Sequence, residues 1–152
     1  MAIEIERKFL VAGEGWRQTD ARRYSQGYLS RDPARTVRVR CVGQQAWLTI
    51  KGRSVGASRA EFEYEIAFAD GEQLLKLCEG PLVDKFRHLV RHAGMLWEVD
   101  EFLGDNAGLV VAEIELSDEA QAFERPPWLG EEVTHDARYF NSNLAAHPFK
   151  HW

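Results

Sequence analysis

Charged side chains of one sign recur at every second residue along several short segments of the chain. Such neighbours point to the same side of a β-strand, about 7 Å apart, so carboxylates could gather a divalent cation and basic groups could gather phosphate oxygens. The acidic set comprises Glu4, Glu6, Glu61, Glu63, Glu65, Glu98, Asp100, Glu113 and Glu115, and the basic set comprises Lys8, Arg38, Arg40, Lys51, Lys85 and Arg87. Together the two sets predict a site that holds a metal ion and a polyanion.

The simplest alternative is the solvated polar face of an antiparallel sheet, which many soluble proteins display. A face built only for solubility gains from mixing charges, because like charges on paired strands are unfavourable neighbours. Here five or six segments keep the two signs apart. This segregation favours a face that binds charge-neutralising ligands over a polar face that is simply exposed to solvent.

The segments that carry these pairs alternate apolar and polar residues, which is typical of β-strands. Expected strands cover residues 3–11, 24–30, 35–41, 47–51, 60–67, 82–91, 95–102 and 109–116. Eight such strands can close into a barrel whose interior holds side chains or one small ligand. We therefore predict a mainly β (α+β) chain that forms a closed eight-stranded antiparallel β-barrel, with the charged face lining a tunnel.

A few peripheral helices are expected around this barrel. Asp70 could cap a helix that stops before Gly80, a second helix could run from Ser117 through Phe123, and a third could cover residues 136–146. No repeat or Pro/Gly/Ser-rich linker divides the sequence, so residues 1–152 are expected to form a single domain.

Composition excludes several classes of protein. The net charge of -5 argues against a general nucleic-acid binder, which normally carries a basic surface. No apolar run approaches the roughly 20 residues that a membrane span requires, and no basic region followed by an apolar stretch precedes Ile3. We expect a cytoplasmic protein with neither nucleic-acid nor membrane partners.

The N-terminal run Glu4-Ile5-Glu6-Arg7-Lys8 resembles the ExExK signature of the CYTH superfamily, the triphosphate tunnel metalloenzymes. The later charged pairs follow the family's order across nearly the whole chain: Arg38-Val39-Arg40, Lys51-Gly52, Glu61-Phe62-Glu63, Lys85-Phe86-Arg87, Val99-Asp100 and Glu113-Ile114-Glu115. The resemblance implies an eight-stranded antiparallel tunnel, a small triphosphate-containing substrate, and Mg²⁺ or Mn²⁺ as the cofactor.

The resemblance also implies roles for individual residues. The metal ligands would be Glu4, Glu6, Asp100, Glu113 and Glu115, and the substrate would be bound by Lys8, Arg38, Arg40, Lys51, Lys85, Arg87, Tyr28 and Arg138. A carboxylate or a lysine near the terminal phosphate would accept the proton of the attacking water. We predict catalytic roles for Lys8, Lys85 and Glu63, and the sequence leaves open which group accepts that proton.

The chain most resembles small bacterial members of the superfamily that act on inorganic tripolyphosphate, through residues 26–29 and the ending at residues 134–139. The predicted function is therefore metal-dependent hydrolysis of inorganic triphosphate. A thiamine-triphosphatase, a nucleoside triphosphatase and an adenylate cyclase of the same superfamily remain alternatives, as does a polyphosphate or nucleotide sensor without turnover. The sequence leaves both a monomer and a homodimer open.

Overall fold

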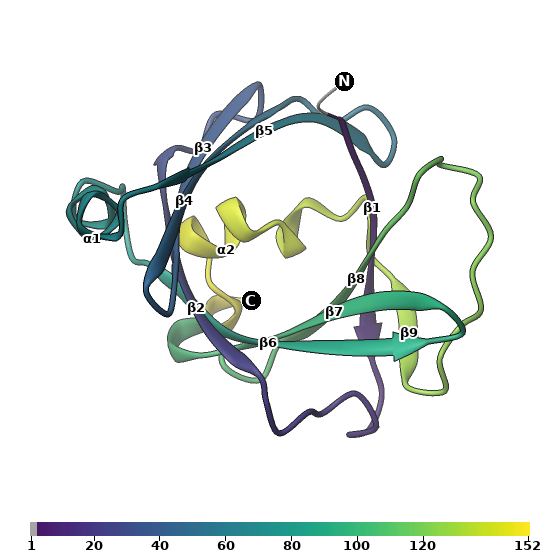
Figure 1. Cartoon of the computed structure of the whole chain (residues 1–152). Helices are drawn as coiled ribbons and strands as arrows, with labels where there is room; N and C mark the ends of the chain where they lie inside the picture. The colour runs from purple at the N-terminus through teal and green to yellow at the C-terminus, as the bar shows by residue number, and fades with distance from the viewer. Residues whose placement is uncertain (1–2) are drawn as a thin grey trace.

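A single antiparallel sheet closes on itself in the computed structural model, which describes residues 3–152 (Figure 1). Its strands are β1 (Ile3–Val11), β2 (Arg22–Ser30), β3 (Arg35–Val42), β4 (Gln45–Gly52), β5 (Ser58–Ile66), β6 (Val83–His92), β7 (Met95–Phe102), β8 (Val110–Glu115) and β9 (Leu129–Glu132). They are ordered β5-β4-β3-β2-β6-β7-β8-β1-β9, and a pairing of β5 with β1 closes the barrel. The predicted closed eight-stranded barrel is confirmed.

The ninth strand, β9, was not predicted. It pairs with the end of β1, at Phe9 and Val11, whereas β5 pairs with the start of β1, at residues 3–5. Strand β9 therefore covers the part of the β1 edge that β5 leaves open. Its four residues are too few to show an alternating pattern, so periodicity could not reveal it.

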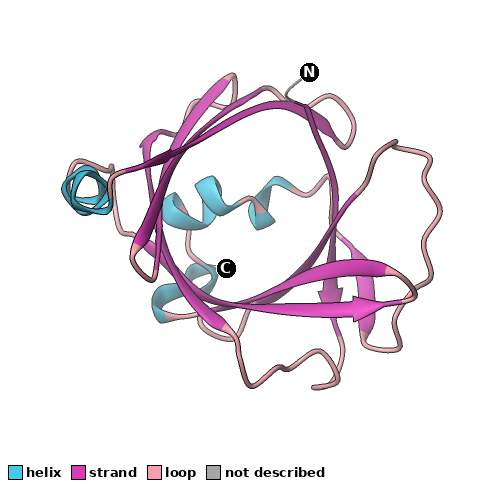
Figure 2. Ribbon diagram, in the orientation of Figure 1, coloured by secondary structure: helices cyan, strands magenta, loops and turns pink. Residues whose placement is uncertain are grey.

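The first helix, α1 (Phe68–Lys76), lies on the outside of the barrel, as predicted, against β3 and β4 (Figure 2). It begins before Asp70, which lies in its first turn instead of capping it. The predicted helix from Ser117 through Phe123 is wrong, because this segment forms turns. The Asp118 carboxylate accepts the Ala120 N–H at 2.8 Å, a local bond that competes with helical bonding.

The predicted third helix is divided into two pieces, because Phe140 has an extended backbone conformation between them. The pieces are η2 (Ala137–Tyr139) and α2 (Asn141–Ala146), and two further short turns are η1 (Gly104–Asn106) and η3 (Phe149–His151). Helix α2 is not peripheral, because it lies within the ring of strands in Figure 1, and Leu144 belongs to the same buried apolar cluster as Phe102 and Val111. None of the helices within residues 3–152 is long and apolar enough to cross a membrane.

The larger hydrophobic cluster lies on the outer wall of the barrel. Its members include Phe9, Trp16, Trp97, Ile114 and Trp128, all nearly or fully buried. Along β1 and β7 these residues alternate with the charged positions that point inward. The chain between β1 and β2 supplies Trp16, and the chain between β8 and β9 supplies Trp128. These two connections therefore cover the apolar outer wall that a charged interior leaves exposed.

Two phenylalanines provide a matched test of this outer core. Phe9 is completely buried, whereas Phe62 is 46% exposed on the outer face of β5. We expect Phe9→Ala to lower the free energy of unfolding by about 3–5 kcal/mol, because it leaves a cavity in a packed cluster. Phe62→Ala should cost about 1 kcal/mol or less. Urea unfolding of both variants checks this, and equal losses would contradict the location of the core.

Candidate active site

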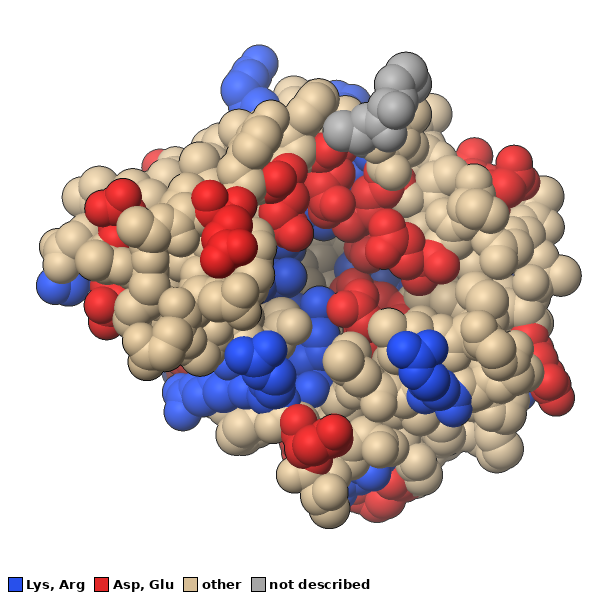
Figure 3. Space-filling model, in the orientation of Figure 1, with Lys and Arg blue, Asp and Glu red and all other residues tan. Residues whose placement is uncertain are grey.

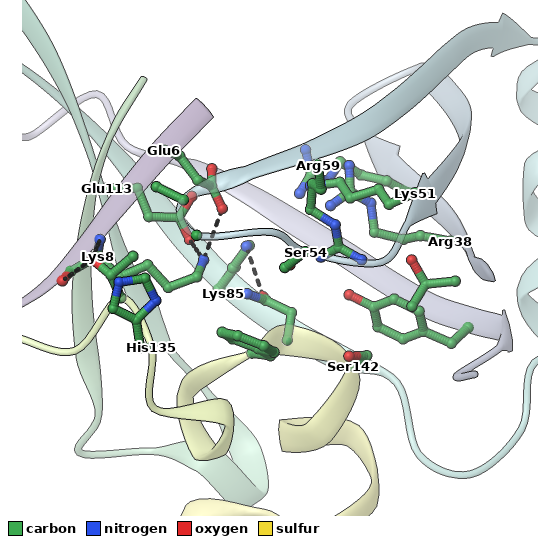
Figure 4. Close-up of a pocket in the computed structure, with 18 of the residues that line it drawn as sticks. Glu6, Lys8, Arg38, Lys51, Ser54, Arg59, Lys85, Glu113, His135 and Ser142 are labelled. Carbon is green, nitrogen blue, oxygen red and sulfur yellow. Dashed lines mark hydrogen bonds and ion pairs between the residues drawn. The ribbon is translucent and has the colours of Figure 1, made fainter. Parts of the chain in front are cut away.

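The inward-facing residues of the strands surround a cavity of about 290 Å³ (Figure 4). Its charged lining is mostly basic: Lys8, Arg38, Arg40, Lys51, Arg59, Lys85 and Arg87 contribute from five strands. The acidic lining residues are Glu6 and Glu113. Such a concentration of buried positive charge is suited to a multiply charged anion.

A smaller acidic compartment of about 150 Å³ adjoins the basic cavity. It is lined by the carboxylates Glu4, Glu6, Glu61, Glu63, Glu98, Glu113 and Glu115, together with Arg38, Arg40, Lys51 and Arg87. Figure 3 shows acidic side chains gathered around a hollow in one face of the molecule, with basic side chains deeper within it. Glu6 and Glu113 line both compartments, so an anion and a cation could meet there.

Two lysines that line the basic cavity pair with carboxylates of the acidic compartment. The Lys8 ammonium donates to Glu6 at 3.0 Å and to Glu113 at 2.7 Å, because the strand register places Lys8 opposite Glu113. The Lys51 ammonium lies 3.0 Å from both Glu4 oxygens and 3.3 Å from Glu61. Burial alone would lower the pKa of Lys8, but Glu113 and Glu6 raise it above its ordinary value, so Lys8 keeps its proton.

Asp100 is fully buried between two basic side chains. Its carboxylate accepts from Lys85 at 2.7 Å and from Arg87 at 2.8 and 2.9 Å. Burial opposes ionisation, but Arg87 and Lys85 lower the pKa of Asp100 to about 2. Asp100 lines neither compartment. The structure thus places this predicted metal ligand where it holds the cationic groups in position.

The basic cavity has more positive charge than its own acids neutralise. Burial lowers the pKa of Lys85 to about 7, and burial together with Arg38 and Arg87 lowers that of Arg40 to about 9. The buried Nε of Arg38 has no hydrogen-bond partner within the described chain. An unpaired buried donor is costly, so an anion that accepts from it would relieve a penalty already present in the fold.

The remaining predicted site residues divide between the cavity and the surface. Tyr28 lines the basic cavity. Glu63 lines the acidic compartment, where it accepts from the Thr49 hydroxyl at 2.8 Å and from Arg38 at 3.4 Å. Arg138 is bound to Asp136 at 2.7 Å with its side chain 62% exposed, and it is not among the cavity-lining residues.

Several residues that line the cavity were not predicted from the sequence. Arg59 alternates with Glu61 and Glu63, so the same pattern would have found it, but the predicted strand began one residue too late. Ser54 comes from the loop before β5, and His135, Asn141 and Ser142 come from the C-terminal segment. No spacing rule connects these residues to the strands, because only the closed barrel brings them together.

Comparison with known proteins identifies the family of this chain. The model of the CYTH domain matches residues 2–148. The chain belongs to the CYTH domain family. An inorganic triphosphatase of Acetivibrio thermocellus is 47% identical over 154 residues, covering 100% of this chain and 99% of that protein. An inorganic triphosphatase of Nitrosomonas europaea is 42% identical over 147 residues, covering 93% and 96% respectively.

A solved structure of an inorganic triphosphatase superimposes on this CYTH protein with a TM-score of 0.67 and 39% identity, covering 93% of this chain and 96% of that chain. The fold and much of the sequence are therefore shared with that enzyme.

The acidic compartment suits a divalent metal by its donor chemistry, since carboxylate oxygens are the ligands that Mg²⁺ and Mn²⁺ prefer. Within residues 3–152, however, no three Asp, Glu, His or Cys side chains are grouped as a ready metal site. Lys8 and Lys51 occupy carboxylates that would otherwise be available. The carboxylates fit a divalent metal once the ammonium groups of Lys8 and Lys51 move away from them.

The low pKa of Lys85 predicts a pH dependence of anion binding. Below about pH 7 the ammonium carries a charge, and above it the charge is lost, so sulfate affinity is expected to fall as pH rises through 7. Sulfate is a suitable probe because it remains a dianion throughout this range. Calorimetric titration should show the fall in the wild type but not in Lys85→Met. An identical pH profile in both would contradict the assignment.

Proposed function

We propose that this CYTH protein hydrolyses inorganic triphosphate (tripolyphosphate) inside the barrel, with Mg²⁺ or Mn²⁺ bound in the acidic compartment. The observation that carries the proposal is the enclosed cavity in which seven Lys and Arg side chains converge, one with a buried N–H that has no partner among residues 3–152. The two inorganic triphosphatases that share 47% and 42% of the sequence support the same activity.

The basic side chains would bind and orient the phosphate chain. Arg38, Arg40 and Arg87 can donate several hydrogen bonds each to phosphate oxygens, and Lys8 and Lys51 add point charges. Charge that builds on the transferred phosphoryl group and on the leaving pyrophosphate would be stabilised by these fixed groups. The protein would thus contribute mainly positioning and electrostatics.

The metal would be held by Glu4, Glu6, Glu113 and Glu115, whose carboxylates line the acidic compartment. When bound, a divalent ion neutralises phosphate charge and lowers the pKa of a coordinated water. Asp100 is left out of this set because Arg87 and Lys85 already engage both of its oxygens.

The proton of the attacking water needs an acceptor, and the two lysines differ in their capacity for this role. The pKa of Lys8 is raised, so it remains a cation, whereas that of Lys85 is lowered to about 7. Neutral Lys85 could take the proton as the water oxygen bonds to the terminal phosphorus and the bridging P–O bond breaks to release pyrophosphate. Glu63 would serve by holding Arg38 and Thr49.

Related activities on the same barrel are separated by measuring product release. Phosphate and pyrophosphate should be quantified with tripolyphosphate, pyrophosphate, ATP and thiamine triphosphate, each with Mg²⁺ or Mn²⁺ and with EDTA. We expect tripolyphosphate to be turned over fastest and EDTA to abolish turnover. Preference for ATP or thiamine triphosphate would replace the proposed substrate, and tight binding without turnover of any would indicate a sensor.

Removing a carboxylate of the acidic compartment tests the metal assignment. Glu4→Ala and Glu6→Ala should each reduce metal-dependent turnover by about 100-fold or more, because each would lose a direct ligand. Glu14→Ala is the control, since Glu14 is an exposed partner of Arg17 outside the barrel. Near-normal turnover in either Glu4→Ala or Glu6→Ala would reject the assignment.

The ion pair of Lys51 with Glu4 predicts that the lysine competes with the metal. Lys51→Gln should bind Mn²⁺ several-fold more tightly than the wild type in the absence of any phosphate, because its neutral amide releases Glu4. Lys150→Gln is the matched control, since Lys150 pairs with Asp105 at the surface. Calorimetric titration with Mn²⁺ is the measurement, and unchanged or weaker binding by Lys51→Gln would contradict the competition.

A further inference from the structure

The side chain of Asn141 reaches the basic cavity from a helix and not from a strand of the β-sheet. Asn141 is the first residue of α2 and is one of the lining residues of the cavity. Its Oδ1 atom accepts from the Lys85 ammonium at 3.0 Å and from the Gln26 amide at 3.2 Å. The dashed line from Lys85 in Figure 4 marks the first of these bonds.

The contact fixes Lys85 from a second direction. Lys85 is only 1% exposed, and its ammonium donates to Asp100 at 2.7 Å as well as to Asn141. Asp100 belongs to β7, whereas Asn141 belongs to the C-terminal segment. An ammonium held between two acceptors on different elements has one defined position, whereas a single ion pair would let the long side chain turn about that partner.

The same oxygen connects Lys85 to a second basic residue. Gln26 is completely buried on β2, and its Oε1 accepts from Arg40 Nε at 3.0 Å while its amide donates to Asn141. A chain of hydrogen bonds therefore runs from Arg40 through Gln26 and Asn141 to Lys85. Two phosphate-binding candidates on β3 and β6 thus share one network of neutral amides.

Asn141 itself is held in place by the packing of α2. Leu144 and Ala145 are buried in the apolar cluster at this end of the barrel. Asn106 of η1 donates to the Leu144 carbonyl at 3.5 Å and accepts from the Phe149 N–H at 2.8 Å. The backbone that carries Asn141 is therefore held by contacts that do not involve Lys85.

We propose that Asn141 is a positioning residue of the active site, which fixes the Lys85 ammonium and couples it through Gln26 to Arg40. The inference rests on the proposed function, because Lys85 is assigned there to the reacting end of the triphosphate. It gives the C-terminal segment a role in catalysis beyond its packing in the apolar cluster around Leu144. Asn141 acts through Lys85 and need not contact the reacting atoms.

The test compares substitutions at two asparagines of the same helix. Asn141→Ala should lower kcat for tripolyphosphate by about 10–100-fold with a much smaller change in KM, because the ammonium loses one of its two acceptors. Asn141→Asp keeps an oxygen in the same place, but its carboxylate raises the pKa of Lys85, so it should recover most of kcat at a pH high enough to deprotonate Lys85. Asn143→Ala removes only a 2.7 Å bond to the Ala137 carbonyl and should leave kcat within about twofold of the wild type.

A purely structural role gives different results. It predicts equal losses of melting temperature and of activity in Asn141→Ala and Asn143→Ala, and no recovery in Asn141→Asp; either result would overturn the inference. Coupling is checked with Gln26→Ala, whose effect on kcat should be smaller in the Asn141→Ala background than in the wild type. Additive effects would reject the proposed chain from Arg40 to Lys85.

Failure of the proposed function can be told apart from failure of this inference. A wild-type protein that releases no phosphate from tripolyphosphate would overturn the function. In that case sulfate binding still decides on the inference. Asn141→Ala should bind sulfate at least about fivefold more weakly than Asn143→Ala if Asn141 positions Lys85, and equal affinities would overturn the inference.

Discussion

Buried charge inside a closed β-barrel, with basic groups concentrated in one cavity, is the constraint on which the rest of this structure depends. A buried charge is costly unless a partner neutralises it, and the Arg40 Nε donates to the neutral amide of Gln26 while burial, Arg38 and Arg87 lower the pKa of Arg40 to about 9. Because the interior is given to these groups, the main apolar cluster lies on the outer wall, around Phe9 and Trp97. The long connections after β1 and β8 then serve as the second layer that a barrel with an apolar interior would not need.

Acidic and basic side chains are separated within the interior, so the buried charges can bind ligands of opposite sign. Carboxylates gather at one side of the interior and basic groups at the other. Lys8 and Lys51 form ion pairs between the two sides, with Glu113 and Glu4. A metal and a phosphate chain would replace these internal ion pairs with stronger ones, since a divalent ion offers two charges and a triphosphate several. A bound metal therefore releases the two lysines for the phosphate chain, and a bound phosphate chain releases the carboxylates for the metal.

Strand periodicity predicted the barrel and most of its charged lining, because residues two apart on a strand must share a face whatever the tertiary structure. Arg59 was not included in the predicted lining because the predicted strand began at residue 60, whereas β5 begins at Ser58. Strand periodicity could not anticipate Asn141, whose place depends on how α2 packs inside the ring of strands, nor the turns that replace the helix expected from Ser117. Asp100 has the spacing of a metal ligand, but only the structure shows that two cations already bind it.

The basic side chains concentrated in the cavity destabilise the folded barrel, and a polyanion relieves this cost. The most direct measurement is the melting temperature of the wild-type protein in EDTA, with tripolyphosphate or with sodium chloride at equal ionic strength. Tripolyphosphate at millimolar concentration is expected to raise the melting temperature by several degrees beyond the salt control, because it binds only the folded barrel. Equal melting temperatures in the two solutions would contradict the claim.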